Sequence, residues 1–181
     1  MSSEELNELH EHAEHAKHDP SLAPVSITMA ILAVLVAVVS LLGHRAATEA
    51  VLNQSRASDQ WAYYQAKNIR GHEDKLFANL TAIVPAANAV ALAKTREDYL
   101  QESERYKEEQ KEIEAEARKL EDEVKLELKR ADRFDLGEVF LEVALVITSI
   151  TLLSRRRVFW MLGLCLGTVG MVVAVTGFMV R

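Results

Sequence analysis

Three long apolar segments bracket one long, charged stretch, and this pattern constrains the fold more than any other feature of the chain. The apolar segments cover residues 21–43, 135–154 and 158–180. At ~1.5 Å per helical residue, the first and the third are long enough to cross a hydrocarbon core ~30 Å thick. The sequence therefore predicts an all-α integral membrane protein with three transmembrane helices, whose first partner is the lipid bilayer.

The charges are segregated from the apolar segments, although the chain as a whole is 49% hydrophobic and 27% charged. Basic and acidic residues are mixed in residues 44–134, and the net charge of −6 comes mainly from an acidic arm at residues 1–20. A nucleic-acid surface would need a basic stripe, so no nucleic-acid partner is expected. Cys165 is the only cysteine. The sequence contains no P-loop, GxGxxG, HExxH or GxSxG motif, and it predicts neither an enzyme nor a cofactor.

The second apolar segment differs from the others because it is short and begins with acidic residues. Glu138 and Glu142 lie at its start, where an ionised group in hydrocarbon costs roughly 2.5–3.5 kcal/mol. His44 and Arg45 reach the same membrane face from the first segment, and the four residues form a predicted charge cluster at the membrane edge. The alternative is that the two glutamates line a path for protons or ions.

Small residues form stripes on the outer two segments. In the first segment Ala30, Ala33 and Ala37 fall at spacings of three and four, which gathers them on one helical face. In the third segment the stripe contains Gly163, Gly167, Gly170 and Gly177. Such faces allow close contact between membrane helices. The opposing helix belongs either to this chain or to a second copy, and a homo-oligomer is predicted.

The charged stretch at residues 44–134 is predicted to be a helical hairpin that forms a stalk outside the membrane. Residues 73–136 contain no glycine, and Pro85 is the only residue that interrupts the helical pattern. The return arm has a regular spacing of seven, typical of a coiled coil, at Tyr99, Tyr106, Ile113 and Leu120. Because half of the core positions of this heptad pattern are polar or small, a single solvated helix is the alternative.

The connection between the second and third segments predicts the orientation. It consists of Arg155, Arg156 and Arg157, and short basic loops stay in the cytoplasm. This places the N-terminus in the cytoplasm, although several basic residues near the charged stretch favour the opposite orientation. The three arginines decide the prediction because long loops translocate largely regardless of charge.

The most distinctive sequence segment of the chain is DQWAYYQAK, at residues 59–67. This segment follows one predicted span and precedes a long charged helix and a two-span hairpin. In this arrangement the chain resembles bacterial membrane proteins of the domain-of-unknown-function 4337 family. The resemblance implies a location in the bacterial inner membrane and no known activity. The residues themselves favour packing of the aromatic side chains against the return arm, with a partner or ligand surface as the alternative, whereas the resemblance favours a surface that defines the family. The residues of this candidate surface are Gln60, Trp61, Tyr63, Tyr64, Gln65 and Lys67.

The N-terminal arm, residues 1–20, is rich in histidine and acidic residues. On a helix, His12 and His15 would align with two carboxylates as weak candidates for metal ligands. No cysteine and no scaffold fix their geometry, so a polar tail without a metal is the preferred interpretation.

Two functions follow as expectations. The first is a self-assembling structural or interaction protein, a scaffold or accessory protein that presents the stalk to an unidentified protein partner. The alternative is an oligomeric transport or channel component that uses the acidic residues of the second span.

Overall fold

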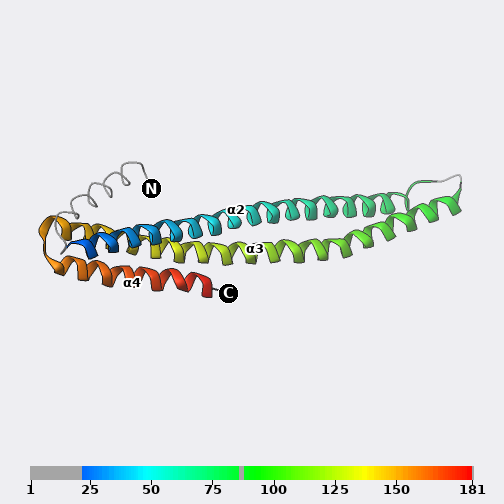
Figure 1. The fold of residues 1–181 in the computed structure, drawn as a ribbon. Coiled ribbons are helices and arrows are strands. Elements are labelled where there is room, and N and C mark those ends of the chain that lie inside the picture. The colour runs from blue at the N-terminus through cyan, green and yellow to red at the C-terminus, as the bar shows by residue number, and fades with distance from the viewer. Residues whose placement is uncertain (1–21, 86–87, 181) are drawn as a thin grey trace. The chain divides into compact units, whose positions relative to one another are not determined.

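The computed structural model of the chain describes residues 22–85 and 88–180. This part of the chain contains three α-helices and no strand: α2 (Ala23–Leu80), α3 (Ala89–Ser154) and α4 (Arg157–Met179) (Figure 1). Each helix includes a stretch that is long and apolar enough to cross a membrane. The prediction of an all-helical protein with three helices of membrane-spanning length is confirmed.

The predicted interruption near Pro85 falls between α2 and α3. Helix α2 runs without a break through Gly71 and ends at Leu80. Proline cannot donate a backbone hydrogen bond and disfavours a helical residue before it, which explains why the helix does not continue. The next helix begins behind an N-cap, because Asn88 Oδ1 accepts a hydrogen bond of 3.1 Å from the backbone N–H of Ala91.

The described residues form two compact units. The first, which we call the apolar unit, contains residues 22–49 and 126–180, and the second, the charged unit, contains residues 50–85 and 88–125. Helices α2 and α3 contribute to both units, whereas α4 belongs to the apolar unit alone.

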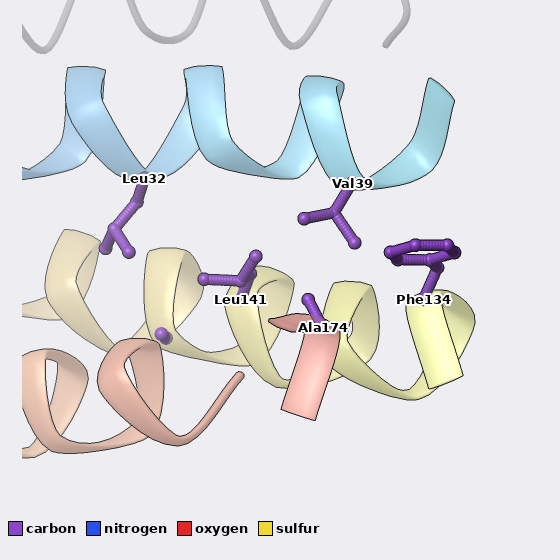
Figure 2. Close-up of a cluster of buried hydrophobic side chains, with 6 residues drawn as sticks. Leu32, Val39, Phe134, Leu141 and Ala174 are labelled. Atoms are coloured by element: carbon purple, nitrogen blue, oxygen red, sulfur yellow. The ribbon is translucent and has the colours of Figure 1, made fainter. Parts of the chain in front are cut away.

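The apolar unit is held together by a narrow core to which all three helices contribute (Figure 2). Helix α2 contributes Leu32 and Val39, and α3 contributes Phe134 and Leu141, which is fully buried. Two alanines, Ala144 and Ala174, complete the cluster. Small side chains at these positions let the helices approach closely, so the core is thin.

The glycine stripe of α4 packs against α3 of the same chain. A Cβ atom built at Gly170 would lie 2.9 Å from the carbonyl oxygen of Gly137, and one built at Gly163 would overlap the hydroxyl of Thr148. At Gly177 the same atom would lie 3.0 Å from the ring of Phe134. The stripe therefore serves contacts within the chain, which answers the question that the sequence left open.

The alanine stripe of α2 is divided between the interior and the surface. Ala33 is buried, whereas Ala30 and Ala37 are exposed. Unlike the glycines of α4, these two alanines form a small-residue face of α2 that the described residues leave uncovered.

In the charged unit, α2 and α3 pack antiparallel, because the partners on α3 have lower residue numbers as the residue numbers on α2 rise. These pairs are Asn53–Glu123, Trp61–Glu121, Lys67–Glu109, Gly71–Ser103 and Phe77–Tyr99. The buried positions of α3 keep the spacing of seven, with Tyr106, Ile113 and Leu120 among them. Fully buried alanines, Ala57 and Ala117, lie between the larger side chains.

The glycine packing predicts that two substitutions on one face of α4 have different effects. Gly170→Ala places a methyl group against the backbone of α3 and should destabilise the apolar unit by about 1–3 kcal/mol. Gly167→Ala meets the end of the flexible Leu32 side chain at 2.9 Å. That side chain can move, and alanine favours the helix by about 1 kcal/mol. Thermal unfolding in an uncharged detergent would measure both variants, and equal melting temperatures would contradict the packing described here.

Candidate interaction surface

The aromatic segment of α2 lies against α3 through its tryptophan. The indole N–H of Trp61 donates a hydrogen bond of 2.8 Å to Glu121 Oε1. The Tyr64 ring meets the Trp61 ring edge-on at 5.6 Å between centroids, and the guanidinium of Arg118 lies 6.0 Å from the centre of the indole. Trp61 and Tyr64 are therefore half-buried packing residues, and the indole N–H of Trp61 faces the return helix.

Lys67 is the charged centre of this contact. Its ammonium lies 2.5 Å from Glu109 Oε2, and it also lies 5.4 Å from the centre of the Tyr63 ring and 4.8 Å from that of Tyr106. The hydrogen bond to Glu109 holds the pKa of Lys67 above its ordinary value. The same bond holds the pKa of the Glu109 carboxyl below its ordinary value.

The six residues of the predicted surface therefore separate into two groups. Gln60, Trp61, Tyr64 and Lys67 are half-buried, whereas Tyr63 and Gln65 are exposed. Only the exposed pair, together with neighbouring apolar side chains of α2, is available to a partner. Ile69 and Leu76 are 59% and 58% exposed, and they line a shallow groove with Asn68, His72 and Glu73.

Two buried polar contacts join the helices of the charged unit at positions that the sequence analysis did not single out. Ser103 is 1% exposed and donates a hydrogen bond of 3.1 Å to the carbonyl of Gly71. Asn53, which is 4% exposed, donates to Glu123 Oε2 at 3.4 Å and accepts from Arg56 at 3.1 Å. Ser103 lies one turn after Tyr99 and therefore on the heptad face of α3, but spacing along one helix could not show that its partner is a backbone carbonyl of α2.

Asp74 is the one carboxylate of the charged unit with a buried oxygen that lacks a hydrogen-bond donor among the described residues. Burial raises the pKa of this carboxyl, and the nearby charge of Glu102 raises it further. Because the folded state favours the protonated form, Asp74 lowers the stability of the charged unit at neutral pH. This cost disappears as the pH falls below the ordinary value of 3.8.

The predicted charge cluster at the membrane edge does not form ion pairs. Within residues 22–85 and 88–180, no ion pair joins His44 or Arg45 to Glu138 or Glu142. His44 Nδ1 instead lies 2.9 Å from the carbonyl oxygen of Ser40. The position of His44 and Arg45 around the helix explains why they do not pair with the glutamates. Both residues follow the buried Gly43 and point away from the interface between α2 and α3.

Glu138 and Glu142 have different surroundings on α3. Glu138 is half-buried, and Glu142 is exposed although it follows the fully buried Leu141 of the apolar core. Val139 and Val146 share the exposed face of α3 with Glu142, and so does Glu138, which lies one turn before it. Glu142 is therefore an exposed carboxyl group that has apolar neighbours and a second carboxyl group on the same face.

The metal candidates of the sequence, His12 and His15, lie outside the described residues. Among the residues that the structure does describe, no group of three or more His, Cys, Asp or Glu side chains is arranged to hold a metal ion. The functional argument therefore rests on surfaces and not on a reaction centre.

A family model for a domain of unknown function, DUF4337, matches residues 21–180. The chain belongs to the DUF4337 family. This match covers all three helices and confirms the resemblance seen in DQWAYYQAK. No curated protein and no solved structure matches the chain. Since the DUF4337 description names no activity, a function must be argued from the surfaces of this chain.

The contact around Lys67 predicts a pH-dependent stability of the charged unit. Glu109→Gln should speed hydrogen exchange of α3 backbone amides near Tyr106 several-fold at pH 7, because it removes the acceptor of Lys67. The pKa of Glu109 is lowered from its ordinary 4.5. The stability that it contributes is therefore present above pH 4.5 and lost as the pH falls through the lowered value.

The matched control is Lys111→Gln, which breaks the pair between Lys111 and Glu108. Both side chains of that pair are about 70% exposed (70% and 72%), and exposed pairs contribute little. Hydrogen-exchange rates of the unaltered chain, Glu109→Gln and Lys111→Gln, compared with one another at pH 7 and again at a pH below 4, measure these effects. Equal effects of the two variants at pH 7 would contradict a special role for Lys67 and Glu109.

Proposed function

We propose that this DUF4337 protein is a self-assembling scaffold or accessory protein of the bacterial inner membrane. The apolar unit anchors it through three transmembrane helices, and the charged unit forms a helical hairpin, a coiled-coil-like stalk outside the bilayer. Three adjacent arginines, Arg155 to Arg157, connect the second and third spans, which supports a cytoplasmic N-terminus. No ligand chemistry is needed for this role.

The observation that carries the proposal is the exposed carboxyl of Glu142. A lone chain in a bilayer would present this group to hydrocarbon, at a cost of roughly 2.5–3.5 kcal/mol if it is ionised. Contact with a second copy offsets that cost when a hydrogen-bond donor of the second copy meets the carboxyl group. Self-assembly through this face of α3 therefore explains an arrangement that is unfavourable in a monomer.

The exposed alanines of α2 supply a surface for the same contact. Ala30 and Ala37 lie on a face that none of the helices α2, α3 and α4 covers, and small side chains let a membrane helix approach closely. The glycine stripe of α4 is not available for this purpose, because it is already packed against α3. Self-association is therefore assigned to α2 and α3.

The exposed residues of the charged unit supply the surface for a different protein. Ile69 and Leu76 are 59% and 58% exposed, and Leu80, which is 41% exposed, continues the same face of α2. An apolar strip on a helix that is otherwise charged is typical of a docking face. We assign the unidentified partner to this strip.

The exposure of Glu142 also supports the alternative function, an oligomeric transport or channel component. In that arrangement Glu142 and Glu138 line a polar path between several copies, since acidic residues within spans often mark ion pathways. The two functions differ in what Glu142 does after assembly. In the scaffold it takes part in the contact, and in the transporter it carries protons or cations.

One substitution separates these functions. In the scaffold, Glu142→Gln should weaken self-association roughly five- to tenfold, because it alters a hydrogen-bonding group buried between copies. Ala30→Leu should weaken association as well, whereas Val146→Leu serves as a control on the apolar surface. Crosslinking in vesicles at several protein-to-lipid ratios would measure the change. Retained assembly of Glu142→Gln with loss of a proton or cation flux would overturn the scaffold in favour of transport.

Site-specific crosslinking in native membranes tests the stalk. A photoreactive residue at Ile69 or Leu76 should give one discrete adduct with a second protein, because both positions lie on the proposed docking strip. The same residue at Glu108, on the charged surface of α3, is the control and should give none. Adducts of equal intensity from all three positions, or none from any, would contradict the assignment of the partner to this strip.

A further inference from the structure

A pocket of about 260 Å³ lies in the apolar unit, where α3 ends and α4 begins. Thr151 and Arg155 line it from the end of α3, Arg157 and Trp160 from the start of α4, and Leu22 and Val25 from the start of α2. The self-association and the stalk described above do not use these residues. One wall of the pocket is basic and another is apolar.

The basic wall has no negative counterpart in the described part of the chain. Among residues 22–85 and 88–180, no carboxylate lies within ion-pair distance of Arg155 or Arg157. Both arginines are exposed at the mouth of the pocket. Two guanidinium groups beside one pocket offer planar pairs of N–H donors, the geometry that matches the oxygens of a phosphate.

A buried hydroxyl provides the second, independent sign of a ligand. Thr151 is 1% exposed, and its Oγ1 has no hydrogen-bond partner within the described residues. A buried polar group without a partner is unfavourable and therefore uncommon. A ligand oxygen in the pocket would supply the missing partner.

The backbone of the connection adds to the same interpretation. Arg155 has a φ of 54°, in the left-handed region that residues other than glycine and asparagine rarely adopt. Helix α4 then begins without a side-chain cap at Arg156, which leaves N–H groups of its first turn available. The start of a helix carries partial positive charge and favours an anion. Strained residues of this kind are common at binding sites.

The apolar wall is fixed in place by a tryptophan. The indole N–H of Trp160 donates a hydrogen bond of 3.1 Å to Thr28 Oγ1, which joins α4 to α2. Thr28 in turn donates to the carbonyl of Pro24 at 2.8 Å. Tryptophan is frequent at the level of lipid headgroups, where one side of a ring meets apolar chains and its N–H finds a polar partner.

We propose that this pocket binds a phosphate group, held by Arg155, Arg157 and the hydroxyl of Thr151. The group comes either from the headgroup of an anionic phospholipid, whose chains contact Leu22 and Val25, or from free phosphate. The proposal goes beyond the scaffold function, because it assigns a ligand to the apolar unit. It does not depend on self-assembly, so the two ideas fail independently.

Titration of the full chain in an uncharged detergent tests the site, with Trp160 fluorescence as the readout. Because the chain has two tryptophans, the titrations use a Trp61→Phe background. The probes are a short-chain phosphatidylglycerol, its phosphatidylcholine counterpart and inorganic phosphate. Saturable binding of phosphatidylglycerol alone identifies a lipid site, and binding of inorganic phosphate as well identifies a general phosphate site. Phosphatidylcholine should bind more weakly, since its ammonium group meets the arginines.

Three variants and a control give the proposal its residue specificity. Arg157→Gln and Arg155→Asn should each raise the Kd roughly tenfold, because each removes a charge-assisted hydrogen bond. Arg156→Gln removes the same charge next to the pocket, but Arg156 does not line it, and its Kd should change less than about threefold.

Thr151→Val separates binding from folding. It removes the unpartnered hydroxyl with little change in shape, so the Kd should rise several-fold while the melting temperature stays the same or increases. Arg155→Asn should likewise not lower the melting temperature, because asparagine tolerates the left-handed backbone. No saturable signal with any probe, or equal losses in Arg156→Gln and Arg157→Gln, would overturn the site.

Discussion

The close approach of α4 to α3 is the contact on which the apolar unit depends. A Cβ atom built at Gly137 would lie 2.8 Å from the Cβ of Ala174, and one at Gly170 would lie 2.9 Å from the Gly137 carbonyl oxygen. All three helices are long and apolar enough to cross a membrane, and helices in lipid gain no hydrophobic energy from contact with protein, so close packing supplies the attraction between them there. The same contact, together with the short connection through Arg155 and Arg156, places the basic residues beside the start of α2.

The charged unit is stabilised by other means, because its helices are paired by side chains rather than by close backbone contact. Its seam alternates large side chains such as Ile113 and Leu120 with fully buried alanines, and it includes the buried polar groups of Ser103 and Asn53. Buried polar contacts fix the register of two helices more strictly than apolar ones, since a shift would leave donors without acceptors. The many ion pairs on the surface of α3 contribute less, because water screens them.

Two polar groups in the apolar unit carry the functional argument, because the described chain does not satisfy them. Glu142 is exposed beside apolar side chains, and the hydroxyl of Thr151 is buried without a partner among the described residues. Both groups are unfavourable in the chain alone. We propose that a second copy covers Glu142 and that a phosphate group bonds to Thr151. In the DUF4337 family, whose description names no activity, such unsatisfied groups are the most informative residues.

The sequence by itself determined the local and periodic features of this protein. Helix propensity and apolar length predicted the three helices, Pro85 predicted the interruption between α2 and α3, and DQWAYYQAK indicated the family. These features depend on neighbouring residues or on a spacing along one helix, both of which the sequence contains. The spacing of Gly163, Gly167, Gly170 and Gly177 likewise predicted that they share one face.

Only the tertiary structure decided what each face meets. It showed that the glycines contact α3 of the same chain, that Trp61 bonds to Glu121, and that Arg45 does not pair with Glu142. It also brought Thr151, Arg155 and Arg157 to one pocket. Helical periodicity fixes which residues lie together on one helix, but not the rotation of that helix against its neighbours. That rotation is set by packing between residues far apart in the sequence, and it determines which polar groups are left without a partner.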